Sequence, residues 1–279
     1  MFRVVSNEEI APKLHRMVIE APRVAAARKP GQFVIVRLDE GAERIPLTIA
    51  DDDREAGTIT LVIQAVGRNT ERIVATPTGG FLMNVAGPLG KPTHLVTGSR
   101  VACVGGGVGT AVLFPLVKAL HQAGNEVTTI IGGRSAAYVI LRNELAALSD
   151  ELLITTEDGS LGTKGFVTSP LGELLADESR RPQAVFAVGP VPMMAAVADQ
   201  TRAYGVPTVV SLNPLMIDGT GMCGGCRVTV GGETKFACVD GPEFDAHLVD
   251  FKELSRRQNA YKEHECRVDR QVALTAEER

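Results

Sequence analysis

The pattern of hydrophobic and polar positions divides the chain near residue 98. Before that point, short apolar stretches rich in Val, Ile and Thr are separated by Gly, Pro and Asp clusters at intervals of roughly ten residues. Short strands with regular spacing are typical of an antiparallel β-barrel. We therefore expect a barrel with one helical turn at 70–75 and strands at 2–6, 15–20, 32–38, 47–50, 58–64 and 81–86.

After residue 98 the pattern changes to strands that alternate with helices, which indicates a doubly wound parallel sheet. We expect strands at 100–104, 126–132, 152–156, 184–188 and 206–212, the last closing the sheet. The helices are expected at 110–122, 141–148, 167–175 and 191–204. The chain then divides into a barrel (1–97), an α/β domain (98–212), a small loop domain (213–250) and a C-terminal helix and tail (251–279).

Composition narrows the class of protein. A chain of 279 residues with 44% hydrophobic positions can fill the cores of two domains and a small appendage. Its net charge of −4 argues against nucleic acid or an anionic membrane as the main partner. The N-terminal residues are charged, no apolar stretch reaches about 18 residues, and the five cysteines are odd in number and clustered. We expect a cytoplasmic protein.

Three of the five cysteines lie in a glycine-rich stretch late in the chain. Cys223 and Cys226 form a C-x2-C step, and Cys238 follows at a distance. Plant-type [2Fe–2S] proteins use C-x4-C-x2-C and a distant fourth cysteine. The first position of that spacing is Asp218 here, and a carboxylate can bind iron. We interpret Asp218, Cys223, Cys226 and Cys238 as the ligands of a [2Fe–2S] cluster.

Two alternative interpretations of the cysteines stay open. Zinc accepts three thiolates and one carboxylate, although one C-x2-C step with a lone cysteine matches paired zinc knuckles poorly. A redox C-x-x-C motif expects a strand-to-helix setting, whereas Cys226 is followed by the strand-like run Arg-Val-Thr-Val. Of the other cysteines, Cys103 is expected to be a buried small hydrophobe and Cys266 a free surface thiol.

The first strand of the α/β domain runs into a glycine-rich turn that opens a helix. Backbone N–H groups at such a helix N-terminus bind a dinucleotide diphosphate. Two further strands end at the same edge of the sheet, one before Gly189-Pro190 and one before the turn that contains Asp158. We predict nucleotide contacts at Gly105, Gly106, Gly107, Val108, Gly109 and Asp158. The run that starts at Gly189 resembles the Gly-Pro-x-x-Met segment of the pyridine-nucleotide domain in the ferredoxin–NADP⁺ reductase superfamily, and this resemblance implies that Gly189, Pro190 and Met193 contact the nicotinamide. Either Met193 or Met194 is expected to be a core residue.

Three short runs of the barrel, in this order, resemble the flavin domain of the ferredoxin–NADP⁺ reductase superfamily. They are Pro30-Gly31-Gln32-Phe33, Arg44-Ile45-Pro46-Leu47-Thr48, and the expected tight turn Gly87-Pro88-Leu89-Gly90. The resemblance implies that Arg44 pairs with the FAD pyrophosphate, that Thr48 acts as the catalytic hydroxyl near flavin N5, and that Pro46 and Leu47 lie along the isoalloxazine. A guanidinium suits a diphosphate.

The resemblance also implies further cofactor contacts in the barrel. Gly67 and Thr70 resemble a second phosphate site at the start of a short helix. The remaining expected contacts are Gln64, Gly87, Pro88 and Leu89. Many members of this superfamily have a cysteine where this chain has Val188, so no thiol role in hydride transfer is expected. The choice between NADH and NADPH stays open, because Arg134 and Ser135 replace an acidic residue after the second strand.

The segments 211–228 and 235–251 resemble a narrower group, the small subunit of NADH-dependent reduced ferredoxin:NADP⁺ oxidoreductase, the electron-bifurcating transhydrogenase. In that family an Asp is a cluster ligand. The resemblance implies FAD, one [2Fe–2S] cluster and NAD(H) in this chain, and a large partner subunit that carries FAD, two [4Fe–4S] clusters and the ferredoxin and NADP(H) sites. Single electrons would pass through the cluster to FAD and leave as a hydride to NAD⁺, reversibly.

Other functions remain alternatives at this point. The same cofactors would serve the electron-transfer subunit of a sulfide dehydrogenase or of dihydroorotate dehydrogenase, which differ in the partner. A third possibility, of another class, is an electron-transfer module that contacts the nucleotide only to sense it.

Overall fold

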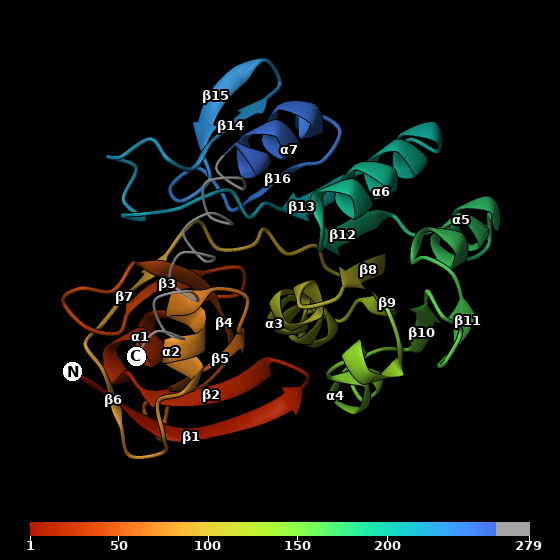
Figure 1. Ribbon diagram of the computed structural model, residues 1–279. Helices are drawn as coiled ribbons and strands as arrows, with labels where there is room; N and C mark the ends of the chain where they lie inside the picture. The colour runs from red at the N-terminus through yellow and green to blue at the C-terminus, as the bar shows by residue number, and fades with distance from the viewer. Residues whose placement is uncertain (261–279) are drawn as a thin grey trace.

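The computed structural model describes residues 1–260 (Figure 1). It begins with a single antiparallel sheet that rolls into a nearly closed barrel, with strand order β6-β1-β2-β5-β4-β3-β7. The strands are β1 Phe2–Ala11, β2 Leu14–Glu20, β3 Phe33–Arg37, β4 Ile45–Asp53, β5 Thr58–Gln64, β6 Phe81–Leu82 and β7 Asn84–Leu89. Alternate residues point inward, as Ile59, Leu61 and Ile63 of β5 show. The predicted barrel is confirmed.

Two features of the barrel differ from the expectation. A short helix that the sequence pattern did not predict, α1 (Pro22–Ala27), follows β2, while the expected helical turn is α2 (Arg68–Val74). The predicted tight turn at Gly87-Pro88-Leu89 is wrong, because these residues belong to β7, in which Leu89 pairs with Phe33 of β3 and Gly87 and Pro88 lie at a register shift. A Cβ at Gly87 would lie 2.8 Å from Cγ1 of Val34, so the glycine serves close strand approach rather than chain reversal.

The α/β domain has the expected doubly wound sheet, in the order β11-β10-β9-β8-β12-β13-β16. Its strands are β8 Arg100–Gly106, β9 Glu126–Gly133, β10 Glu151–Thr156, β11 Thr163–Lys164, β12 Ala184–Val188, β13 Thr208–Ser211 and β16 Glu243–Asp245. Its helices are α3 Gly109–Gln122, η1 Ala136–Tyr138, α4 Arg142–Ala146, α5 Thr168–Ala176 and α6 Val191–Ala203.

The two faces of the sheet carry separate cores. Ala102 and Val104 of β8 pack toward α5 and α6, whereas Val101 and Cys103 pack toward α3 and α4. Because successive side chains of a strand point to opposite faces, one strand contributes to both cores. Burial raises the pKa of the Cys103 thiol, as expected for a small hydrophobe.

The parallel sheet does not end where the sequence suggested. The expectation that the strand at 206–212 closes it is wrong, because β16 pairs antiparallel with β13. The chain reaches β16 only after a loop and the hairpin β14 Arg227–Val230 and β15 Glu233–Phe236. The pairing joins β13, before the domain boundary expected at residue 212, to β16 after it. The division of the chain into four regions stays a prediction.

A final helix, α7 (Phe251–Asn259), packs beside α6 and the hairpin (Figure 1). Asp250 caps it by accepting a hydrogen bond from the backbone N–H of Glu253 at 2.9 Å, and Leu254 is buried beneath it. The expected tail with Cys266 lies outside the described residues. None of the helices within 1–260 has the length and apolar character needed to cross a bilayer.

Polar bonds connect the barrel to the rest of the molecule. Lys118 of α3 donates to Asp51 of β4 at 2.8 Å, and Arg16 of β2 pairs with Glu144 of α4 at 2.7 Å. Behind the barrel, the hydroxyl of Thr93 donates to Oε1 of Glu243 at 2.7 Å. Burial raises the pKa of Glu243 to about 7, which outweighs the opposite effect of the Thr93 hydrogen bond.

Glu243 should make folding stability depend on pH. Between the ordinary pKa of 4.5 and the folded value of about 7, the folded chain keeps a proton that the unfolded chain releases. Stability therefore falls with rising pH across this window, by at most about 1.4 kcal/mol per unit. We expect Glu243→Gln to remove this fall and to be more stable than the natural chain at about pH 8.

Urea unfolding of the full chain at about pH 5 and about pH 8 measures the difference. Glu126→Gln, at an exposed glutamate, is the matched control and should follow the natural chain. An equal pH dependence for Glu243→Gln and the natural chain would contradict the role of Glu243.

Candidate functional site

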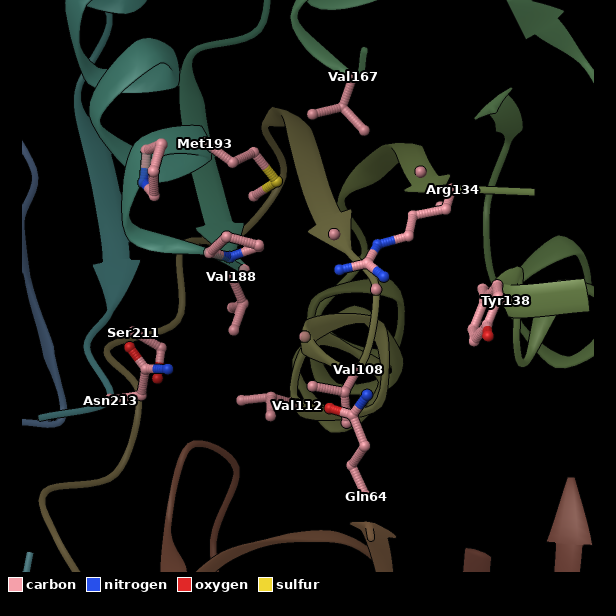
Figure 2. A pocket seen from close by; sticks show the side chains of 18 of the residues that line it. Gln64, Val108, Val112, Arg134, Tyr138, Val167, Val188, Met193, Ser211 and Asn213 are labelled. Atoms are coloured by element: carbon pink, nitrogen blue, oxygen red, sulfur yellow. The ribbon is translucent and has the colours of Figure 1, made fainter. Parts of the chain in front are cut away.

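A cleft of about 930 Å³ lies where the barrel, the α/β domain and the C-terminal segment meet (Figure 2). Its size is at the upper end of ordinary ligand sites. The barrel contributes Phe33, Pro46, Thr48 and Gln64 to its walls. From the α/β domain come Gly106, Gly107, Val108, Gly109, Val188, Gly189, Pro190 and Met193, and from the segment after β13 come Asn213, Met216 and Pro242.

The glycine-rich turn between β8 and α3 forms one wall, at the point where the strand order reverses between β8 and β12. Ligands of doubly wound sheets bind at this point. A Cβ at Gly109 would lie 2.5 Å from the carbonyl oxygen of Val188, so only glycine lets α3 begin this close to β12. Gly107 adopts φ +56° and faces open space. Gly105 lies beneath the cleft, against Leu113 and Thr110.

The turn after β12 forms the neighbouring wall. Gly189, Pro190 and Met193 line the cleft, and a Cβ at Gly106 would lie 2.5 Å from Sδ of Met193. The two glycine-containing turns therefore pack against each other through the thioether of Met193. Met194 is fully buried in the core, which confirms that one of the two methionines is a core residue.

Strand β4 presents alternate residues to the cleft. Pro46 and Thr48 line it, while Leu47 between them packs toward the barrel core. Gln64, at the end of β5, also lines the cleft, whereas Arg44 is exposed just before β4 and lies outside the lining. Of the Arg-x-Pro-Leu-Thr run, the structure thus brings the proline and the hydroxyl to the cleft.

Other predicted contacts lie near the cleft without lining it. The Thr70 hydroxyl accepts the N–H groups of Val66 and Gly67 at 3.1 Å each, so it caps α2. Gly87, Pro88 and Leu89 lie in β7. The carboxylate of Asp158 accepts hydrogen bonds from the hydroxyl and N–H of Ser160, which lower the pKa of Asp158. Its neighbour Glu157 lines the cleft instead.

Sequence reasoning did not assign two aromatic side chains that line the cleft, Tyr138 and Phe166, and it left the role of Arg134 open. Arg134 and Tyr138 follow β9, facing Met193 across the cleft in Figure 2, and Phe166 precedes α5. Arg134 stands at the carboxyl end of a parallel strand, which is a usable signal. Tyr138, at the end of the short η1, and Phe166, on the loop before α5, are exposed aromatics, and no local pattern distinguishes such residues from other surface positions.

The predicted iron ligands lie on the loop between β13 and β14 and just after β15. The thiols of Cys226 and Cys238 are buried and 3.1 Å apart. The Asp218 carboxylate accepts the N–H groups of Thr220 at 2.9 Å and Cys223 at 2.8 Å, which lowers its pKa. Cys223 is exposed.

The structure thus gathers two of the four predicted ligands. In the part of the chain that it describes, no three carboxylate, thiol or imidazole side chains share one centre. The donor set still fits iron, because two thiols already meet and the other two donors belong to the same hydrogen-bonded loop. Desolvation, followed by the hydrogen bond from Cys226, raises the pKa of the Cys238 thiol to about 12.

The barrel followed by a doubly wound sheet is also the fold of a known reductase. It is similar to the ferredoxin reductase in carbazole 1,9a-dioxygenase, with a TM-score of 0.63 at 19% identity over 74% of this chain and 65% of that one. Residues 213–250 match the iron-sulfur cluster binding domain of dihydroorotate dehydrogenase B.

Two relatives match nearly the whole chain. The dihydroorotate dehydrogenase B (NAD(+)) electron transfer subunit homolog of Thermotoga maritima is 46% identical over 94% of this chain and 92% of its own. A chain of the NADH-dependent reduced ferredoxin-NADP oxidoreductase, solved in work on flavin-based electron bifurcation, is 44% identical, with a TM-score of 0.92 and 98% of both chains covered. The protein belongs to the family of dihydroorotate dehydrogenase B electron transfer subunits and their homologues.

Gly109→Ala tests the wall between β8 and β12. The added methyl group meets backbone atoms that cannot rotate away, so we expect about 1–3 kcal/mol of lost stability. Displacement of the turn should also weaken dinucleotide binding about tenfold, which is about 1.4 kcal/mol. Gly41→Ala is the control, because a Cβ there would meet only the Asp39 side chain at 3.6 Å. Calorimetric titration with NADH measures binding, and unchanged affinity in Gly109→Ala would contradict the assignment.

Proposed function

We propose that this chain is the FAD- and [2Fe–2S]-containing subunit of an electron-bifurcating NADH-dependent ferredoxin:NADP⁺ oxidoreductase. The observation that carries the proposal is a shared wall. The loop between β13 and β14, residues 212–226, carries Asp218, Cys223 and Cys226 and is called the ligand loop. Phe33 of β3 and Met216 of this loop both line the cleft, and both pack in the apolar cluster that contains Cys226 and Cys238. A group held by the ligand loop and a flavin in the cleft would be separated only by these side chains.

The three cofactors divide the chemistry. When bound, a [2Fe–2S] cluster exchanges single electrons, nicotinamide exchanges a hydride, and flavin connects the two by accepting either. We infer that the protein would hold them in that order, from the loop that carries Asp218 and Cys223 through β3 and β4 to the turns after β8 and β12, because these elements share the apolar cluster and the cleft. The route from partner to NAD⁺ is reversible.

We assign a task to each predicted residue that lines the cleft, and one to Arg44, which lies outside the lining. Thr48, which lines the cleft beside Pro46, would offer its hydroxyl as a hydrogen-bond donor to flavin N5. Arg44, before the same strand, supplies charge to the FAD pyrophosphate. The N–H groups that follow Gly106 would hold the dinucleotide phosphates, and Gly189, Pro190 and Met193 would contact the nicotinamide.

We assign the partner to the face that carries the ligand loop. Leu215, Ile217 and Met222 flank Asp218 and Cys223, and their side chains are 55%, 51% and 88% exposed. Exposed apolar residues concentrated on one loop favour a protein contact. The partner is a large subunit with its own FAD and two [4Fe–4S] clusters, through which ferredoxin reacts. We infer a cytoplasmic location from the clustered free thiols.

The match at 213–250 favours one alternative, the electron transfer subunit of a dihydroorotate dehydrogenase. The two functions share cofactors and differ in the partner. Purification of the native complex distinguishes the two functions. A complex that oxidises dihydroorotate must contain a dihydroorotate dehydrogenase partner, whereas a complex that exchanges electrons with ferredoxin and NADP⁺ must contain the large subunit of the bifurcating enzyme.

Thr48→Val tests hydride transfer in the cleft. Loss of one hydrogen bond at the reacting flavin should slow reduction by NADH about tenfold, since each 1.4 kcal/mol is a factor of ten. Stopped-flow loss of flavin absorbance measures the rate, with FAD content as the check on binding. Thr60→Val, in β5 and outside the cleft lining, should leave the rate unchanged. Without flavin reduction by NADH in the natural protein, the proposed function fails.

Asp218→Cys tests the carboxylate ligand. A fourth thiolate donates more electron density to iron than a carboxylate does, so we expect the midpoint potential to fall by roughly 50 mV or more and the EPR signal to change. Asp240→Asn, at a carboxylate that accepts the Phe236 N–H, is the control and should keep the EPR signal. An unchanged potential and spectrum in Asp218→Cys would show that Asp218 is not a ligand.

A further inference from the structure

Two arginines bind the peptide backbone between Cys223 and Cys226. Nη1 of Arg227 donates to the carbonyl oxygen of Gly224 at 3.0 Å. Nη2 of Arg257, on α7, donates to the carbonyl oxygen of Gly225 at 3.3 Å. Both peptide units of the Gly-Gly step therefore have a guanidinium at the carbonyl end, although the two arginines are thirty residues apart in the sequence.

The other end of the first peptide unit faces a ligand sulfur. The N–H of Gly225 belongs to the same peptide as the carbonyl of Gly224, and it donates to Sγ of Cys223 at 3.4 Å. Gly224 adopts φ +67°, a conformation that a glycine accepts without strain. The order guanidinium, carbonyl, N–H, sulfur is a chain of aligned dipoles, and each member polarises the next.

Arg257 is held in place by its helix rather than by the loop alone. The Asp250 cap and buried Leu254 fix α7, and Gln258 of the same helix donates to the carbonyl oxygen of Asn213 at 2.9 Å. Arg257 is half-buried, whereas its neighbour Arg256 is exposed. Two adjacent arginines of one helix thus differ in their contact with the ligand loop.

We propose that Arg227 and Arg257 are positioning residues that raise the reduction potential of the iron–sulfur cluster through the Gly224 and Gly225 carbonyls. The inference rests on the cluster binding proposed above. Reduction adds negative charge at the sulfurs, and N–H dipoles backed by guanidinium groups stabilise that charge. The Asp218 carboxylate, which accepts the N–H of Cys223, acts in the opposite direction, so the arginines also offset its effect.

The test measures midpoint potentials by EPR-monitored titration of the loaded full chain in three variants: Arg227→Gln, Arg257→Gln and Arg256→Gln. Each removes one positive charge, but only the first two lose a bond to the Gly-Gly step. We expect each of these two to lower the equilibrium constant for one-electron reduction by threefold to tenfold, the upper value being about 59 mV. Arg256→Gln should remain at the natural potential.

The inference would be overturned if all three variants had the midpoint potential of the natural chain. It would also be overturned if all three variants shifted the potential equally, because an equal shift indicates a general effect of charge. If Arg257→Gln fails to retain the cluster, the comparison of Arg227→Gln with Arg256→Gln decides. Thermal unfolding of the cluster-free proteins identifies a purely structural effect of α7, and a potential shift that occurs only with lost stability counts against the inference. If the natural chain binds no iron–sulfur cluster, the proposed function fails instead.

Discussion

The contact between β3 of the barrel and the ligand loop is the interaction on which the site depends. Phe33 and Ile35 pack against Met216, Ala237 and the two buried cysteines. Barrel, sheet and C-terminal segment all reach the cleft, but this apolar cluster is where the ligand loop gains a fixed position relative to β4. Apolar packing is non-directional, so the distance between the loop and β3 depends on the size of the residues at the contact. A close fit of the loop therefore requires small residues. Gly219 supplies one, because a Cβ there would lie 2.8 Å from Leu89 and 2.9 Å from Ile35.

The polar bonds between the pieces have a different role. Lys118 with Asp51, and Arg16 with Glu144, are partly exposed ion pairs, which contribute little free energy individually. The ion pairs do fix the orientation of the pieces relative to each other. Lys118 lies on α3, which begins at the glycine turn, and its partner Asp51 lies on β4, the strand that carries Thr48. The apolar cluster thus holds the pieces together, and the ion pairs select how α3 is aligned with β4.

Local signals made much of this structure predictable. Periodic apolar positions identified the barrel and the doubly wound sheet, and the glycine turn after β8 was evident because its meaning depends only on neighbouring residues. The spacing of Asp218 and the three cysteines was equally local. In contrast, β16 has three residues and pairs with β13 across more than thirty residues, so no periodicity could indicate it. Tyr138 and Phe166 both line the cleft only because segments distant in the sequence reach it, and Leu47 shows that a sequence motif does not reveal which of its members faces inward.

The antiparallel pairing of β13 and β16 has a consequence for how such a protein could be assembled or altered. The ligand loop and the hairpin leave the sheet at the end of one strand and return on the strand beside it. Neighbouring strands are about 5 Å apart, so the whole excursion begins and ends at nearly one place. The segment between β13 and β16 is therefore an insertion whose two ends lie close together. Its length changes the entropy of loop closure only slowly, and the parallel strands do not need to move to accommodate it. The reductase core could therefore gain, lose or exchange its electron relay as one cassette.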